Sequence, residues 1–222
     1  MFNHVKLETP LTELNAEMTS AGRVYITPTG ERYPSITTVL SLLSRDSITK
    51  WKKRVGLDVA NRISTQASKR GTAVHQLAED YVNNDKDWAM GAMPSNLFTF
   101  STIKPLLDKH LDNVVMQEAP LYSDRLRIAG RVDAIAEWDG ELAIVDYKTS
   151  KKPKKLEYIQ GYLIQESVYA ACFYELTGIP IKKIVTVIAV DDNDPQVFID
   201  TPFQYLPKFL EVREQYRQEH GF

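Results

Sequence analysis

The stretch that decides the fold is "AIVDYKTSKK", residues 143–152, in which an apolar run ends abruptly in an acid and a base. Side chains along a strand alternate between its two faces, so residues two apart point the same way. A strand here places Ile144, Asp146 and Lys148 on one face and Tyr147 on the other. Opposite charges at the end of a buried strand fit two interpretations, a plain ion pair or a metal ligand beside a charge-stabilising group.

The composition predicts a soluble globular chain forming a single domain over residues 1–222, with 43% hydrophobic and 25% charged residues. No apolar run is long enough to span a bilayer, and the opening residues lack the features of a secretory signal. The single cysteine, Cys172, excludes an internal disulfide and an all-cysteine metal site. These features predict a cytoplasmic location, in a bacterium or in a phage-infected host cell. The formal charge of −2 argues against a uniformly basic surface but allows a local basic groove.

Apolar periodicity and turn residues predict the order of the elements. Helices are expected first, with Ser35 as the N-cap of one of them, followed by three meandering strands, a long helix, a strand and a last helix. The residues between the third and fourth helical stretches, 87–97, are expected to form a loop. The expected elements are a hairpin over 23–35, helices over 36–44, 46–54, 55–83 and 100–111, strands over 113–123, 126–140 and 141–149, a helix over 156–176, a strand over 182–191 and a helix over 205–220.

This order predicts an α/β fold of the mixed α+β kind, with a central mixed β-sheet flanked by helices. The long helix supplies a parallel crossover between the third and fourth strands. Within the single domain, residues 1–65 are expected to form an N-terminal hairpin and helical region, 66–190 the core, and 191–222 a C-terminal helix.

Four polar positions interrupt the predicted strands. Glu118 lies in the first strand, Asp133 in the second, and Asp146 and Lys148 end the third. A meander brings such positions to one edge of the sheet, and His75 comes from an earlier helix. A divalent cation would stabilise carboxylates held this close, and Mg²⁺ or Mn²⁺ suits a set of oxygens with one imidazole. Such an ion binds a phosphate oxygen and lowers the pKa of an attacking water, which Lys148 can orient while it stabilises negative charge.

Each residue also has a plainer interpretation. A lone strand carboxylate usually faces water, a lone histidine is usually solvated or part of the core, and a run of lysines is usually a solvated loop. The joint order favours a site: a helix with histidine, a strand with glutamate, a strand with aspartate, and a strand with Asp-x-Lys before a helix.

This order resembles the RecB-like branch of the PD-(D/E)xK nuclease superfamily. The stretches that carry the resemblance are "RGTAVHQLAEDY" (70–81), "GRVDAI" (130–135), "VDYKTS" (145–150) and "GYLIQESVYA" (161–170). The resemblance implies a restriction-endonuclease-like core and a Mg²⁺ or Mn²⁺ site. It implies metal ligands at His75, Asp133, Asp146 and the backbone carbonyl of Tyr147, and Gln165 and Tyr169 near the site and the DNA. Val132 stands where proline is frequent in the superfamily, as is common in this branch.

The upstream stretch "YPSITTVLS" (33–41) and Trp51 are similar to the mitochondrial genome maintenance exonuclease group and its phage and bacterial relatives, which cut single-stranded DNA from free ends. The resemblance therefore implies a metal-dependent exodeoxyribonuclease acting in replication, recombination or repair, with Asp133, Asp146, Lys148 and Glu118 as catalytic residues. No GxxxxGK[ST] motif is present, so any unwinding would come from a partner such as a helicase, and a single-strand-binding protein is a further possible partner.

Nucleic-acid contacts are expected from basic and aromatic residues together, a combination that suits single strands. The candidates are Lys151, Lys152, Arg70 and Trp51, with Tyr158 and Tyr162 as further stacking faces, and the resemblance adds Gln165 and Tyr169. Two alternatives remain: a flap or structure-specific endonuclease with the same fold, and a DNA-binding module without catalysis. No membrane partner is expected.

Overall fold

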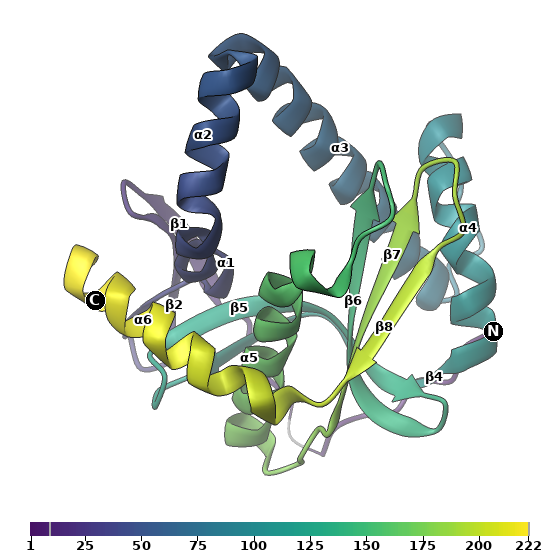
Figure 1. Cartoon of the computed structure of the whole chain (residues 1–222). Coiled ribbons are helices and arrows are strands. Elements are labelled where there is room, and N and C mark those ends of the chain that lie inside the picture. Colours follow the sequence, from purple (N-terminus) through teal and green to yellow (C-terminus); the bar gives the residue numbers. More distant parts are fainter. Residues whose placement is uncertain (9, 222) are drawn as a thin grey trace.

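The structure is a computed structural model that describes residues 1–8 and 10–221. Two β-sheets and six α-helices follow one another along the described chain, as Figure 1 shows. The elements are β1 (Asn15–Thr19), β2 (Gly22–Ile26), β3 (Arg32–Pro34), α1 (Ile36–Leu40), a 3₁₀ turn η1 (Ser41–Ser44), α2 (Arg45–Val55), α3 (Leu57–Val82), α4 (Pro94–His110), β4 (Leu111–Ser123), β5 (Ile128–Trp138), β6 (Glu141–Ser150), η2 (Leu156–Tyr158), α5 (Gln160–Thr177), β7 (Lys183–Val190), β8 (Gln196–Asp200), η3 (Pro202–Tyr205) and α6 (Leu206–His220).

The main sheet has five strands in the order β4-β5-β6-β7-β8. β6 and β7 run parallel and are joined through α5, whereas the other neighbours are antiparallel. A parallel pair needs such a crossover because a short turn cannot carry the chain back to the end of the sheet where the first strand began. The predicted mixed sheet with flanking helices is therefore confirmed.

The sheet divides in its middle, and this division creates the site. β5 and β6 pair only from Trp138–Glu141 to Ala134–Val145. Beyond that point β5 continues along β4, while β6 continues along β7 as far as Ser150. Figure 1 shows the two strands diverging. Polar backbone and side-chain groups near the divergence are thereby left available for other partners.

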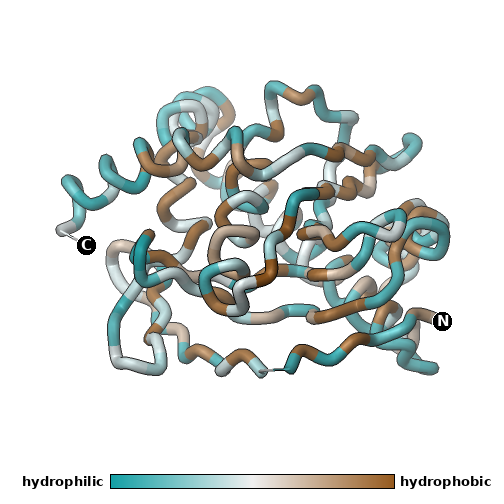
Figure 2. Tube along the Cα trace, turned by 90° about the horizontal axis from the view of Figure 1, so that it is seen from below, coloured by the Kyte–Doolittle hydropathy of each residue, from teal (hydrophilic) through white to brown (hydrophobic). Residues whose placement is uncertain are grey.

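Helices cover both faces of the main sheet and bury its alternating side chains. Ile144 belongs to the core formed with α1, α5 and α6, and its neighbour Val145 belongs to the core formed with α3 and α4. The alternation predicted for this strand is confirmed, because each face carries its own apolar cluster. Hydrophilic residues dominate the last turns of α6 near the C-terminus in Figure 2. Among the described residues, no helix is both long and apolar enough to cross a membrane.

The N-terminal region forms a small antiparallel sheet of β1, β2 and β3 that leads directly into α1. Ser35 is the predicted N-cap, and its hydroxyl accepts a hydrogen bond from the backbone N–H of Thr38 at 3.0 Å. Ser35 also forms a bridge to Ala129 of β5, so the start of α1 is held against the main sheet.

Helices α2 and α3 form an arch that rises away from the sheet in Figure 1. They meet at Gly56, whose φ of 87° is a conformation that glycine adopts without a steric cost. Every residue from 61 to 69 is exposed, and after Ala60 the next buried residue of α3 is Val74. We use the name arch for residues 45–70.

Four features differ from the sequence predictions. Residues 94–97, expected in a loop, begin α4, in agreement with the preference for proline at the first position of a helix. The long helix starts at Gln160, after the 3₁₀ turn η2, rather than at Leu156. The segment 191–222 is not helix alone, because it contains β8 before α6, and the expected division at residue 65 falls inside α3.

Candidate active site

Three side chains converge where the sheet divides. His75 of α3, Glu118 of β4 and Asp133 of β5 each offer a ligand atom, and these atoms lie within 4.8 Å of one another. His75 Nδ1 is 3.5 Å from Asp133 Oδ2. Asp133 Oδ2 also accepts a hydrogen bond from the backbone N–H of Tyr147 at 2.8 Å, which bridges the two strands just where their backbone pairing stops.

Glu118 faces Asp133 through a local irregularity of β4. The flanking pairs are Gln117–Ala134 and Ala119–Val132, while Glu118 itself has a φ of 45°. Positive φ is uncommon for a residue with a side chain and is often found at functional sites. The guanidinium of Arg131 donates to the Glu118 carbonyl, so a charged hydrogen bond supports the unusual backbone.

Asp146 and Lys148 lie on the same face of β6, as the alternation predicts. The Lys148 ammonium pairs with Asp146 Oδ2 and lies 5.2 Å from the centre of the Tyr162 ring. The Asp146 side chain is almost fully buried, and that of Lys148 is 19% exposed. The ion pair is real, and it lies beside the carboxylates of the neighbouring strands.

Gln165 and Tyr169, one turn apart on α5, connect the two halves of the divided sheet. The amide of Gln165 donates to Asp146 Oδ1 at 3.5 Å and to the Tyr169 hydroxyl at 3.2 Å. The Tyr169 hydroxyl in turn donates to the carbonyl of Arg131 at 2.7 Å. These bonds hold β6 and β5 at a defined separation beyond the point where they stop pairing.

Gly130 makes this contact possible. A Cβ atom at this position would lie 2.9 Å from the ring of Tyr169, closer than real contacts come, and 3.0 Å from the end of the Ile36 side chain of α1. A side chain here would displace Tyr169 from β5, so the glycine is needed for close approach rather than for its backbone angles.

Two carboxyl groups of the site have raised pKa values, because the positive charges near them do not offset their burial. Burial, together with Asp133 and Glu79, raises the pKa of Glu118 to about 7. Burial also raises the pKa of Asp146 above its usual range, and Lys148 offsets this only in part.

For two other groups of the site, the charges of neighbouring side chains outweigh the effect of burial on the pKa. Burial works against the charged form of Asp133, but His75 and Lys148 outweigh it and lower the pKa of this carboxyl. Burial also disfavours the His75 imidazolium, yet Asp133 raises the pKa of His75 on balance. Asp133 is therefore the ionised member of the cluster, while Glu118 takes up a proton near neutral pH.

A divalent cation fits this donor set. Two carboxylates and an imidazole are ligands that Mg²⁺ and above all Mn²⁺ accept. Burial and the neighbouring negative charges raise the pKa of Glu118. A bound cation would offset the effect of those negative charges. Asp146 Oδ2 contacts the Lys148 ammonium, so the charge of this carboxylate is already neutralised on the neighbouring strand.

The site opens into a cavity of about 300 Å³. Sequence reasoning assigned no site role to seven of its residues, and among these Arg23, Ser35 and Thr37 come from β2 and the start of α1. Only the upstream similarity over 33–41 gave a signal for the last two. The lining residues are Arg23, Tyr25, Ser35, Ile36, Thr37, His75, Gly130, Arg131, Asp133, Lys148, Gln165 and Tyr169.

Other predicted residues lie outside this cavity. Arg70 forms a salt bridge with Asp191 after β7 and lines a different groove with Lys69. Trp51 is partly buried on α2, within the arch. Lys151 and Lys152 are exposed on the loop that follows β6.

Glu166 is a buried acid that sequence reasoning missed. It follows Gln165 on α5, is fully inaccessible to solvent, and accepts a hydrogen bond from the Thr186 hydroxyl. Its second oxygen has no hydrogen-bond partner. Burial, then the charge of Asp146, raises the pKa of Glu166 well above its usual value.

We expect Glu166→Gln to stabilise the protein at alkaline pH. An acid whose pKa is higher in the folded than in the unfolded chain stabilises fully below its unfolded pKa, and this stability is lost as the pH rises through the folded pKa. Glutamine retains the neutral form at every pH. Thermal unfolding at pH 5 and pH 8.5 should show a gain of a few degrees at the higher pH and little change at the lower, since about 1 kcal/mol moves Tm by about 2–4 °C. The exposed Glu157→Gln is the control, and an equal effect of Glu166→Gln at both pH values would contradict the expectation.

Comparison with known proteins agrees with this geometry. Residues 90–198 match the profile of the PD-(D/E)XK nuclease superfamily. The match includes Glu118, Asp133, Asp146 and Lys148, while His75 lies before it. The part of the chain that carries these four residues thus matches the PD-(D/E)XK nuclease superfamily.

Individual relatives are more distant. The chain is 24% identical over 205 residues to mitochondrial genome maintenance exonuclease 1 of Homo sapiens, which covers 84% of this chain and 58% of the human protein. The Mus musculus protein of the same name is 24% identical over 131 residues, covering 55% and 38% of the two chains. The chain therefore spans between about two fifths and three fifths of the length of these relatives. A crystal structure of a "Putative exonuclease" from Eubacterium rectale superposes with a TM-score of 0.41, 15% identity and 68% coverage of each chain.

Proposed function

We propose that this chain is a metal-dependent DNA nuclease that degrades single-stranded DNA from free ends. The observation that carries the proposal is the convergence of His75, Glu118 and Asp133 within 4.8 Å, with Lys148 on the adjacent strand lining the same cavity as His75 and Asp133. This arrangement provides acidic ligands for Mg²⁺ or Mn²⁺ beside a cation that faces a phosphate. A module that only binds DNA has no need of both.

The residues of the site have two roles in the proposed reaction: holding the metal ion and stabilising charge on the phosphate. His75, Glu118 and Asp133 would hold the ion, with Asp146 and the Tyr147 carbonyl as further ligands. The ion, when bound, supplies a Lewis acid for the phosphate and a water of lowered pKa. Burial works against the charge of Lys148, but Asp146 and Asp133 raise the pKa of its ammonium on balance. Lys148 is therefore a proton donor and a positive charge, suited to orient the water and to stabilise the developing charge on phosphate oxygens.

The charge and the exposed apolar residues of the arch favour a single-stranded substrate. Residues 45–70 hold eight Lys and Arg but only two Asp and Glu, a formal charge of +6 in a chain whose total is −2. Apolar side chains are exposed among these cations, with Leu57 at 66% and Ile63 at 36%. Cations attract phosphates, and apolar faces suit the exposed bases of a single strand. The preference for ends follows if the strand passes beneath the arch to reach the cavity, because a circle has no end to thread.

Linear single-stranded DNA is expected to be degraded at least about 100-fold faster than the same sequence as a covalently closed circle. The measurement compares labelled linear and circular single strands and a blunt duplex, with Mg²⁺ or Mn²⁺ at one salt concentration. The duplex should be cut more slowly than the linear strand, because its bases are stacked and unavailable to the apolar residues of the arch. Cleavage of the circle at the same rate would replace the exonuclease with an endonuclease of the same chemistry. Binding of all three without any cleavage would favour a silent DNA-binding module.

A further inference from the structure

A single side chain from β8 holds the lysine-rich loop that follows β6. Gln196, the first residue of β8, accepts a hydrogen bond from the Lys154 backbone N–H at 2.6 Å. Its amide nitrogen donates to the Lys154 carbonyl at 2.9 Å. A side-chain amide that bonds both backbone groups of one residue takes the place of a neighbouring strand, because it offers one donor and one acceptor side by side. The loop 151–155 is thus attached to the edge of the main sheet.

Two further contacts fix the beginning of the loop. The Ser150 hydroxyl donates to the Lys152 carbonyl at 2.7 Å, and the Asp191 N–H donates to the Ser150 carbonyl at 2.9 Å. Pro153 restricts its own backbone angle between these attachments. Four lysines in five residues would repel one another and leave an unattached loop mobile, so these bonds give it a defined path.

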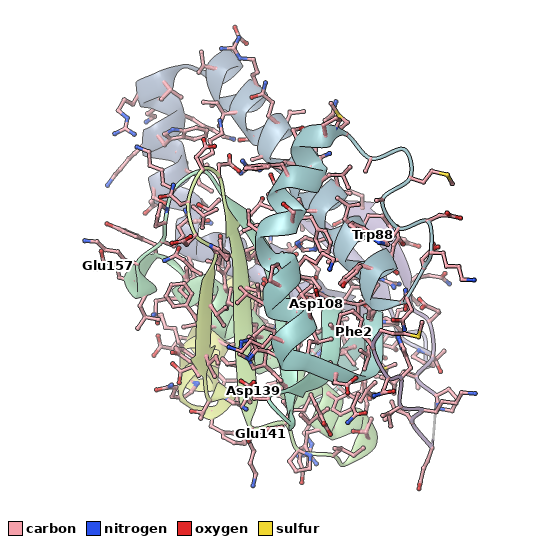
Figure 3. The ribbon with its side chains drawn as sticks, turned by 90° about the vertical axis from the view of Figure 1, so that its right-hand side faces the viewer. Phe2, Trp88, Asp108, Asp139, Glu141 and Glu157 are labelled. Atoms are coloured by element: carbon pink, nitrogen blue, oxygen red, sulfur yellow. The ribbon has the colours of Figure 1, made fainter. Side chains whose placement is uncertain are left out.

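The fixed loop presents cations and an aromatic ring to solvent. Lys151, Lys152 and Lys155 are exposed, and η2 follows at once with Tyr158 at 68% exposure. We call the loop 151–155 together with η2 the rim. Glu157 of η2 lies at the outer edge of the molecule in Figure 3. The rim begins three residues after Lys148, so it lies on the chain shortly beyond a residue that lines the cavity.

We propose that Gln196 is a positioning residue for DNA: it holds the loop 151–155 so that its lysines meet the phosphates of the strand entering the site. The inference rests on the proposed function and concerns substrate binding rather than the chemical step. A loop held in place before binding loses less conformational entropy when its lysines contact phosphates. A free loop with the same lysines would bind more weakly, because it must be ordered during association.

The test is Gln196→Leu, which removes both hydrogen bonds at similar side-chain volume. Gln218→Leu is the matched control, since within the described part of the chain the Gln218 side chain bonds Glu214 of the same helix, α6. Binding to a fluorescent single-stranded oligonucleotide is measured in EDTA over a range of salt concentrations, and cleavage with metal gives kcat and KM. Gln196→Leu is expected to raise Kd and KM by about 5–10-fold and to flatten the salt dependence, with kcat within about twofold, since fewer lysines release counterions.

A variant with Lys151, Lys152, Lys154 and Lys155 changed to Ala separates the mechanisms. If Gln196 acts through these lysines, adding Gln196→Leu to this variant should weaken binding no further. Unchanged affinity of Gln196→Leu, or a fall with an unaltered salt slope and an equal further fall in the lysine variant, would overturn the inference. A wild-type chain that neither binds nor cleaves single-stranded DNA would instead overturn the proposed function.

Discussion

Asp133→Asn is expected to lower kcat/KM for DNA cleavage by on the order of 10³-fold, or about 4 kcal/mol of transition-state stabilisation. Asparagine keeps an oxygen that can accept the hydrogen bond from the Tyr147 N–H, now 2.8 Å from the carboxylate, so the division of the sheet should persist. The charge is lost, and with it the ligand that lies beside both His75 and Glu118. The activity and the affinity for Mn²⁺, measured by calorimetry, should fall together.

Asp139→Asn is the control for this substitution. Asp139 is an aspartate just beyond the other end of β5, where it pairs with His110 at 2.6 Å in the turn to β6. Its replacement should leave cleavage unchanged and should affect only stability. EDTA should abolish wild-type cleavage, and added Mg²⁺ or Mn²⁺ should restore it. Wild-type rates in Asp133→Asn, or lost activity with unaltered Mn²⁺ affinity, would remove Asp133 from the metal site.

Much of the sheet could be predicted because its local signals agree with its tertiary role. The Asp139–Gly140 turn joins β5 to β6 with positive φ at both residues, as the sequence predicts for a tight hairpin. Ser35 caps α1 for an equally local reason, since its hydroxyl satisfies a backbone donor of the first turn. The two-residue period of β6 placed Ile144 and Asp146 on one face because period alone decides the side.

The remaining features depend on contacts between distant segments. β8 is short and follows an acidic turn, so its period is too brief to stand out, and only pairing with β7 makes it a strand. Arg23 reaches the cavity because Ser35 bridges β5, a contact that no local pattern contains. Gln196 carries no motif at all, because its partner is the backbone of Lys154, whose identity does not matter to the bond.

Lys148→Ala is expected to reduce kcat by about 10²–10³-fold, the usual cost of removing one charged or donor group from a site where charge develops. The ammonium is held by Asp146 and the Tyr162 ring, so its loss also leaves the Asp146 charge without its partner. Lys183→Ala is the matched control: Lys183 is also half-buried and paired, with Glu141 at 2.9 Å, but it lies at the opposite end of the parallel strand pair. That variant should lose stability and keep its kcat.

Lys148→Arg distinguishes a compact donor from a simple positive charge. A guanidinium keeps the charge but is planar and larger, and the space between Asp146 and the Tyr162 ring, 5.2 Å from the ammonium, is fitted to a point-like group. An arginine that pairs with Asp146 would also direct its remaining donors away from the position of the water. We therefore expect Lys148→Arg to remain within about tenfold of the alanine variant in single-turnover cleavage, where chemistry rather than binding is measured. Recovery of most of the wild-type rate would show that charge alone suffices, and Lys148 would then stabilise the phosphate without orienting the water.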